Sequence, residues 1–370
     1  MDFESNLPGN IKSLKAYVAG KTISEVEKYY KPKQISKLAS NENRLGCSHK
    51  VREAVLNCLA EIQDYPDPIA SELRKKIAKQ NGVNENEVLL AAGSESLISI
   101  ICRTFFKDNE HAITANATFV GFFVQAGVRG IEVKRVPVDA DYNFDVDAIL
   151  NSVTPDTKMV YIANPNNPTG TFISKQKFQK LINGLPDHVF LIADEAYHEY
   201  AVHNPDYPKA MDYRRDNVII LRTFSKAYGL AGFRIGYAIA HERAISEMSK
   251  VKLTFEPTTP AQVAAITALD DQEFIRNSVD MVVEGREDLY RFFDEHSIRY
   301  LKSNANSVMM ILENEKDAID FTDGMLKEGV ILRRVNAFGL PNCIRITIGQ
   351  QKEMEHFKRS FLEVMEASIN

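Results

Sequence analysis

Lys226 stands in the segment RTFSKAYGLAGFRIGY, directly after an apolar run at 217–224. A lysine in such a place is by itself more often a solvated surface residue, but its neighbours change the interpretation. Ser225 supplies a hydroxyl group and Arg234 a permanent cation, a pair that suits a bound phosphate. Only a neutral amine attacks a carbonyl carbon, and a nearby cation favours that form. We therefore predict that Lys226 forms a Schiff base, with close backbone approach at Gly229, Gly232 and Gly236.

Three further polar residues follow strand-like runs and match different atoms of one cofactor. Asp194 ends the run VFLIAD, where a buried carboxylate would keep a pyridine nitrogen protonated. Tyr197 can donate a hydrogen bond to a phenolic oxygen, and Asn167 in the turn NPNNPTG suits the same oxygen. A plain tight turn would also explain the composition of NPNNPTG. Together with a Schiff-base lysine and a phosphate site, these residues predict pyridoxal 5′-phosphate as the cofactor.

The segment LLAAGSESLIS adds a second candidate for the phosphate site. Ser94 and Glu95 open a predicted helix directly after an apolar run, and the free N–H groups of a helix N-terminus attract an anion. An ordinary serine cap would give the same pattern. Phe119 in NATFVGFF is placed to stack on the pyridine ring, although a phenylalanine is more often a core residue.

Alternating strands and helices are predicted to position these residues. The short, β-branched apolar runs are typical of strands buried on both faces of a parallel sheet. They lie at 87–93, 111–116, 158–164, 189–197, 217–224 and 234–240. Between them lie helical patterns such as Glu95–Phe106, with apolar residues on one face. This alternation predicts an α/β fold, in which ligands bind at the carboxyl ends of the strands.

After about residue 256 the pattern changes to that of a smaller α+β domain. A long helical region at 260–296 is followed by strand-like segments at 307–312, 330–335 and 343–349, with a helix near 317–328. We predict an N-terminal arm that forms part of the small domain (1–35), a large cofactor-binding domain (36–258) and a small C-terminal domain (259–370). The large domain is expected to contain a mostly parallel seven-stranded sheet flanked by helices.

Composition excludes several other classes of protein. Hydrophobic residues at 44% and charged residues at 26% are ordinary globular usage, and a net charge of −5 leaves no electrostatic footprint for nucleic acid or an anionic membrane. No apolar run is long enough to span a bilayer, and the acidic N-terminus does not resemble a signal peptide. The four cysteines are far apart, which predicts reduced thiols in a cytoplasmic enzyme. His198 and His203 lack metal-ligand spacing, so no metal site is expected.

The ordered set of motifs resembles the fold-type I aminotransferases that use pyridoxal phosphate, most closely the histidinol-phosphate aminotransferases. The resemblance covers nearly the whole chain, and a chance match to all its pieces in this order would be rare. The pieces are LKAYVAGK (14–21), LASNENRLG (38–46), YPDP (65–68), AAGSES (91–96), NPNNPTG (164–170), ADEAYHEY (193–200), RTFSKAYGLAGFRIGY (222–237), GVILRR (329–334) and CIRIT (343–347).

The resemblance implies a role for each matching residue. Lys226 would carry the cofactor as an internal aldimine and act as the base, Asp194 would pair with the ring nitrogen, and Asn167 and Tyr197 would hold the phenolic oxygen. The phosphate would lie among Ser94, Glu95, Ser225 and Arg234, with Tyr65 arriving from the neighbouring subunit of a homodimer with shared active sites. Tyr17, Asn41, Arg333 and Arg345 would contact the small-molecule amino donor and the 2-oxo acid.

Some positions depart from the family pattern. Arg44 stands where a proline is usual after NEN, NAT precedes Phe119 where a proline is more common, and Arg334 adds a cation beside Arg333. These changes leave open an aromatic or other amino-acid aminotransferase, or a phosphothreonine-type decarboxylase. A P-loop nucleotide-binding protein is rejected, because AGKT at 19–22 has Lys15 where that motif requires glycine.

Overall fold

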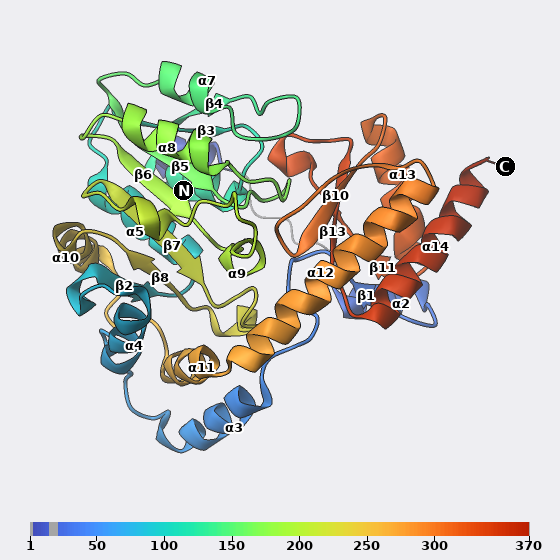
Figure 1. Cartoon of the computed structure of the whole chain (residues 1–370), viewed down its shortest axis with the longest axis horizontal. Helices are drawn as coiled ribbons and strands as arrows, with labels where there is room; N and C mark the ends of the chain where they lie inside the picture. The colour runs from blue at the N-terminus through green and yellow to red at the C-terminus, as the bar shows by residue number, and fades with distance from the viewer. Residues whose placement is uncertain (1–2, 15–20, 370) are drawn as a thin grey trace.

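Two lobes lie side by side in the computed structural model, which describes residues 3–14 and 21–369 (Figure 1). One long helix, α12 (Gln272–Glu295), starts beside the larger lobe and packs along the smaller one. The larger lobe holds the wide central sheet, and the smaller lobe holds a second sheet and the C-terminal helix. Tyr17, predicted to contact substrate, lies outside the described residues.

The sheet of the larger lobe has seven strands in the order β2-β8-β7-β6-β5-β3-β4. Its pairs are parallel except those of β8, which runs antiparallel to both β7 and β2. The predicted α/β fold with a mostly parallel seven-stranded sheet is confirmed. The strands are β2 (Val88–Ala91), β3 (His111–Ala115), β4 (Glu132–Val136), β5 (Thr157–Ala163), β6 (Phe190–Asp194), β7 (Val218–Thr223) and β8 (Gly236–Ile239).

Strand β4 was not predicted from the sequence, because it lies at the edge of the sheet and three of its five residues are charged. A central strand is buried on both faces and reads as a continuous apolar run, whereas an edge strand does not have to.

Helices cover both faces of this sheet and form three layers. On one face, α5 (Ser94–Phe105), α6 (Val120–Arg129) and α10 (Glu242–Val251) pack on the sheet through Ile98, Phe122 and Ile245. The other face is covered mainly by α4 (Ser71–Asn81), α7 (Val146–Asn151), α8 (Lys175–Gly184) and α11 (Thr259–Asp270). Helix α3 (His49–Cys58) lies against α11 at the bottom of Figure 1. The short α9 (His198–Ala201) follows β6.

The smaller lobe contains a four-stranded antiparallel sheet in the order β12-β13-β10-β9. Its strands are β9 (Arg299–Leu301), β10 (Ser307–Ile311), β12 (Arg333–Arg334) and β13 (Cys343–Thr347). A parallel pair, β1 (Ser36–Lys37) with β11 (Val330–Ile331), adjoins it, together with α2 (Ile23–Tyr30), α13 (Glu315–Lys327) and α14 (Gln351–Ile369). The single strand predicted at 330–335 is therefore two strands that belong to different sheets.

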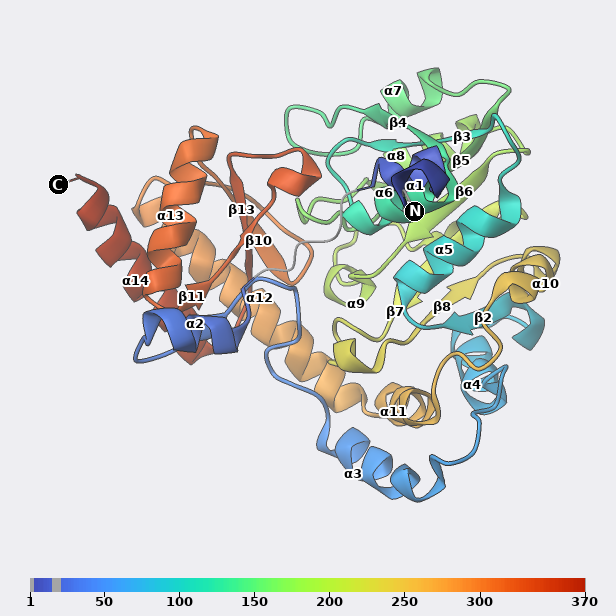
Figure 2. The same ribbon diagram turned by 180° about the vertical axis from the view of Figure 1, so that it is seen from behind.

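Packing clusters cut across the predicted domain boundaries. Helix α1 (Gly9–Lys12) lies on the larger lobe and α2 on the smaller lobe, as Figure 2 shows from behind. The Asn10 side chain in α1 donates to the carbonyl of Val128 at 2.9 Å. Leu38 belongs to the core of the smaller lobe, and Ala264 in α11 to that of the larger. The predicted helical region at 260–296 divides at Asp271, the C-cap of α11 and N-cap of α12. The division of the chain into domains at residues 35 and 258 remains a proposal.

Candidate active site

Lys226 follows β7 in a turn whose backbone is closely packed. Gly229, three residues later, has a φ of +71°, and a Cβ atom there would lie 2.0 Å from the carbonyl oxygen of Gly46. The turn is thus pressed against the segment that leads into α3. The Lys226 side chain is half-buried, and its Nζ lies 5.6 Å from the centre of the Tyr197 ring. The amine therefore faces the ends of β6 and β7 and does not project into bulk solvent.

Asp194 is a buried carboxylate at the carboxyl end of β6, 3% exposed. Its oxygens accept hydrogen bonds from the Tyr161 hydroxyl at 2.7 Å and the Ala196 N–H at 3.1 Å. Burial raises the pKa of Asp194 to about 6, although Tyr161, Ala196 and the Lys226 ammonium all lower it. A carboxylate held this far from water favours a positively charged partner.

Tyr161 was not identified from the sequence. It lies in β5, its hydroxyl is buried beside Asp194, and its ring stacks on Phe122 with centroids 4.3 Å apart. The run KMVYIAN that contains it has the pattern of any buried strand, so the Tyr161 hydroxyl gave no separate signal.

Tyr197 is held by a residue from the N-terminal part of the chain. Its buried hydroxyl accepts a hydrogen bond from Asn41 Nδ2 at 2.9 Å. Asn41 has a φ of +53°, and its own side-chain oxygen and backbone N–H both contact the hydroxyl of Thr347 in β13. Asn41, predicted to contact substrate, is therefore placed between the two lobes.

Asn167 lies in the loop 164–170 between β5 and α8. Its side-chain oxygen accepts a hydrogen bond from Arg345 Nη1 at 2.6 Å, and Arg345 Nη2 donates to the carbonyl of Ala39 at 2.7 Å. Arg345 is 5% exposed and stands opposite Arg333 in the pairing of β13 with β12. Two predicted substrate contacts thus lie side by side at the edge of the smaller lobe nearest the loop.

The predicted phosphate site is built where β2 and β8 meet the start of α5. Arg234 Nη1 lies 3.4 Å from Ser225 Oγ, and a Cβ atom on Gly93 would approach Arg234 Nη2 to 2.8 Å. On Gly236 a Cβ would lie 2.9 Å from the backbone nitrogen of Ser94. Helix α5 begins at Ser94 without a side-chain cap, and the first N–H groups of a helix have no partner within it. Free N–H groups beside a guanidinium are groups of the kind that bind an anion, and this place is called the candidate anion site.

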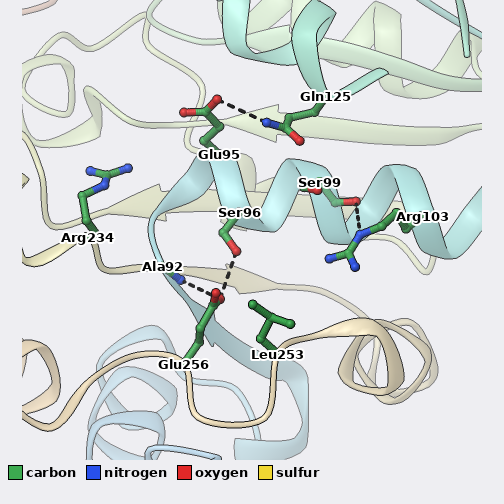
Figure 3. A pocket seen from close by; sticks show the side chains of 9 residues that line it. All are labelled: Ala92, Glu95, Ser96, Ser99, Arg103, Gln125, Arg234, Leu253 and Glu256. Carbon is green, nitrogen blue, oxygen red and sulfur yellow. Dashed lines mark hydrogen bonds between the residues drawn. The ribbon is translucent and has the colours of Figure 1, made fainter. Parts of the chain in front are cut away.

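Glu95 does not join this site with its side chain. Figure 3 shows its carboxylate turned toward α6, where it accepts a hydrogen bond from Gln125 Nε2 at 3.3 Å. Glu95 and Ser96 lie on opposite sides of a pocket at the start of α5. The pocket has a volume of about 320 Å³ and is also lined by Arg234, Leu253 and Glu256. The Glu95 carboxylate thus turns away from the start of α5, whereas the Glu256 carboxylate lies there and accepts hydrogen bonds from the Ala92 N–H at 3.3 Å and from Ser96 Oγ at 3.1 Å.

Two other predicted residues remain. Phe119 precedes α6, a Cβ atom on Gly121 would lie 2.5 Å from its ring, and the ring packs against the core cluster that contains Tyr161 and Phe122. Tyr65 is 78% exposed and stacks on Phe255 with ring centroids 4.2 Å apart. The exposure of Tyr65 is consistent with contact to a second copy of the chain.

A buried ion pair supports the strands beneath the site and was also missed. Arg222 in β7 donates from Nε and Nη2 to Glu195 Oε2 at 3.0 and 2.8 Å. Burial would raise the pKa of Glu195, but Arg222, His198 and the Ala210 N–H hold it below its ordinary value. The pair fixes the residue next to Asp194, which limits where the Asp194 carboxylate can lie.

Comparison with known proteins agrees with this geometry. Residues 33–361 match the family model described as aminotransferase class I and II. The chain is 41% identical over 357 residues to a histidinol-phosphate aminotransferase of Geobacillus sp., covering 96% of this chain and 97% of that protein. It is 38% identical over the same length to the corresponding enzyme of Anoxybacillus flavithermus, covering 96% and 95%.

Solved structures agree in fold. A histidinol-phosphate aminotransferase of Sinorhizobium meliloti in complex with pyridoxal 5′-phosphate superposes with a TM-score of 0.90 at 26% identity, covering 98% of each chain. An aspartate aminotransferase of Thermotoga maritima, at 18% identity, shares the fold with a TM-score of 0.86, covering 97% of this chain and all of the other.

Proposed function

The chain belongs to the class I and II aminotransferase family, and from that membership we propose that it transfers the amino group of L-histidinol phosphate to 2-oxoglutarate. The products would be imidazole acetol phosphate and L-glutamate, a step of histidine biosynthesis. The observation that carries the proposal is the arrangement of Lys226, Asp194 and Tyr197 at one edge of the sheet, facing Arg345 on the other lobe.

The enzyme depends on pyridoxal 5′-phosphate, and the chemistry of the site fits that group. Asp194 is a buried carboxylate whose hydrogen-bond partners, Tyr161 and Ala196, are neutral, Ser94 and Arg234 supply groups that suit a phosphate, and Lys226 supplies an amine near Asp194. When bound, the cofactor accepts the electrons of a carbon–hydrogen bond broken next to the amino group. We assign the ring nitrogen to Asp194 and the phosphate to Ser94, Ser225 and Arg234.

The residues of the chain would orient the substrate and move one proton. Lys226 Nζ would take the proton from the substrate carbon that carries the amino group and deliver it to the cofactor carbon that keeps the nitrogen. In the half-reaction with the 2-oxo acid it would move a proton in the reverse direction. Asn167 and Tyr197 hold the phenolic oxygen, and Asn41 sets the position of the Tyr197 hydroxyl. Arg345 is already bonded to Asn167, so an anionic group bound to its guanidinium is held close to the phenolic oxygen.

Arginine at this edge fits substrates that are all anions. Arg333 and Arg345 face each other across two strands, and a planar guanidinium binds carboxylate or phosphate through two hydrogen bonds. Glutamate and 2-oxoglutarate carry two carboxylates, and histidinol phosphate carries a phosphate. Arg334 forms an ion pair with Glu315 at 3.0 Å and is not assigned to substrate.

A panel of amino donors tests the proposed substrate. We expect kcat/KM for L-histidinol phosphate to exceed that for aromatic amino acids at least tenfold, because a phosphate and an arginine form charge-assisted bonds that an apolar ring lacks. No turnover of L-histidinol phosphate with any 2-oxo acid would contradict the proposal, and carbon dioxide release from phosphothreonine without a 2-oxo acid would identify a decarboxylase.

We further propose a homodimer with shared active sites. Large apolar side chains are exposed along α3 and the following segment and on the neighbouring segment 252–256, at Leu56, Leu59, Ile62, Tyr65, Leu253 and Phe255. Leu253 also lines the pocket beside Arg234, so this apolar surface continues to the candidate anion site (Figure 3). Exposed apolar surface of this kind is typical of an interface, and Tyr65 from the partner subunit would then reach the phosphate.

Mixing two inactive variants tests whether the sites are shared. We expect Tyr65→Ala to weaken cofactor binding and Lys226→Ala to be inactive. In a mixed dimer, one site combines an intact Lys226 with the intact Tyr65 of the other subunit, so activity returns. Activity no greater than that of the two variants kept separate, or a mass equal to the 41.7 kDa of one chain by light scattering, would contradict the proposal.

A cytoplasmic location is part of the same proposal. The four cysteines are free, as expected of a reducing compartment. Among the described residues, no helix is both long and apolar enough to cross a membrane.

A further inference from the structure

Arg286 is a buried arginine in the middle of α12, 8% exposed, on the face that packs Val282 and Leu289 into the core of the smaller lobe. Within the described residues it forms no ion pair with a carboxylate, and its Nη1 instead donates to the carbonyls of Ser303 at 2.6 Å and Ala305 at 3.2 Å. Burying a guanidinium costs desolvation free energy that two hydrogen bonds to carbonyl groups repay only in part, so an apolar residue here would give a more stable core.

The carbonyls that Arg286 binds belong to a short segment, Ser303–Asn306, that connects β9 with β10. The same segment is held by a second residue of α12, because the Ser303 N–H donates to the Tyr290 hydroxyl at 2.7 Å. Ser303 also bonds internally, since its Oγ accepts from the Ala305 N–H at 3.0 Å. The segment is therefore fixed from behind by α12.

In front, the segment touches the loop that presents Asn167. The Asn304 N–H donates to the carbonyl of Gly170 at 2.8 Å, and a Cβ atom on Gly170 would lie 2.1 Å from Ser303 Oγ. The Gly170 N–H donates to the carbonyl of Asn166, and the Asn166 N–H donates to the carbonyl of Thr171. These two hydrogen bonds close the turn around Asn167. The position of Asn167 thus depends on the position of the segment.

The other end of the segment is linked to Tyr197, the second residue proposed to hydrogen-bond the phenolic oxygen of the cofactor. Asn306 Nδ2 donates to the carbonyl of Asn41 at 3.0 Å, and Asn41 donates to the Tyr197 hydroxyl. One segment of the smaller lobe is therefore bonded both to the loop of Asn167 and to the residue that holds Tyr197.

We propose that Arg286 is a positioning residue of the active site, which fixes the segment Ser303–Asn306 and through it the hydrogen-bonding groups of Asn167 and Tyr197. The role assigned to those two groups rests on the proposed function, whereas the coupling between Arg286 and the loop does not. Arg286 itself contacts neither cofactor nor substrate in this account.

Amide hydrogen exchange of the protein freed of cofactor tests the coupling between Arg286 and the loop of Asn167, and it requires no measurement of activity. In Arg286→Met we expect exchange at least about tenfold faster in peptides covering 301–306 and 164–171, with β6 unchanged, because local opening follows the loss of the bonds that closed the segment. Arg286→Lys keeps the positive charge and N–H donors on a single nitrogen, and should give an intermediate change. Arg276→Met, an exposed arginine of the same helix, is the matched control and should match the parent.

The enzyme with its cofactor bound provides a second measurement, the pH midpoint of the cofactor absorbance, which would not change if Arg286 only stabilised the fold. With Asn167 and Tyr197 less well placed, the pH at which the lysine-linked cofactor changes its visible absorbance should rise, because fewer hydrogen bonds favour the unprotonated phenolic oxygen. We expect kcat to fall about 10- to 100-fold with KM changed much less.

Thermal unfolding first establishes that each variant is folded. If Arg286→Met does not fold, Tyr290→Phe removes the acceptor of the Ser303 N–H with little change in packing and takes its place. Faster exchange in 301–306 together with 164–171 supports the proposal. A folded variant with parental exchange in 164–171 and an unchanged absorbance midpoint overturns it. Failure of the donor panel would instead reject the proposed substrate and leave the exchange result unaffected.

Discussion

Lys226→Ala is expected to lower kcat at least ~10⁴-fold and to remove the visible absorbance of the lysine-linked cofactor. Two functions are lost together, since the Nζ atom is both the point of covalent attachment and the group that carries the proton. The turn that presents Lys226 is set by the contact between Gly229 and Gly46, which the substitution leaves in place. We therefore expect a folded protein.

Two controls separate the role of Nζ from a loss of charge. Lys226→Arg keeps a cation but cannot form the covalent bond, and it should be nearly as inactive as the alanine variant. Lys250→Ala removes an exposed lysine that pairs with Glu247 on α10 and should retain full turnover. If Lys226→Ala kept the absorbance and more than a tenth of the parental turnover, the central assignment of the site would be wrong.

Asp194→Asn is expected to inactivate the enzyme and yet to stabilise the protein freed of cofactor above pH 6. The pKa of Asp194 is raised by burial from 3.8 to about 6. A carboxyl group with a raised pKa in the folded state binds a proton more tightly when folded, so the apoprotein loses stability as the pH rises from about 4 to 6. At pH 8 the cost reaches about 3 kcal/mol, at 1.4 kcal/mol for each pKa unit.

The amide of the variant carries no charge and avoids this cost, and its oxygen can still accept from Tyr161 or Ala196. Denaturant unfolding of the apoproteins at pH 4 and pH 8 measures the effect. The variant should be more stable at pH 8 by on the order of 1–3 kcal/mol, with a smaller difference at pH 4. Asp187→Asn, at an exposed position, should show no such dependence. Equal stability of parent and variant at pH 8 would contradict the raised pKa.

Activity should respond in the opposite direction from stability. An amide cannot keep the ring nitrogen protonated, so kcat should fall about 10²-fold or more even with the cofactor saturating. In the parent enzyme, the protonated ring nitrogen of the cofactor would supply a positive charge beside the Asp194 carboxylate. Cofactor binding should therefore remove the loss of folding stability that the ionised Asp194 causes above pH 6. A buried carboxylate retained at this cost is typical of a functional group.

Much of the fold followed from short-range sequence patterns. The apolar runs that end at Asp194 and before Lys226 are buried on both faces of a sheet, and such runs are recognisable without knowledge of their neighbours. Because parallel strands place their carboxyl ends at one edge, the residues after each run were expected to meet there. The reversed direction of β8 was not predicted, since an apolar run carries no record of strand direction.

The sequence by itself determined the family, and its motifs singled out the residues that we propose carry the chemistry, the lysine after β7 and the aspartate that ends β6. Only the tertiary structure decided their partners. Tyr161 on Asp194, Asn41 on Tyr197 and Arg345 on Asn167 join residues 33, 156 and 178 positions apart. Such contacts depend on how strands pack side by side and how the two lobes meet across α12, which is a property of the whole core rather than of any local pattern. For the same physical reason, the carbonyls bound by Arg286 became visible only in the folded chain.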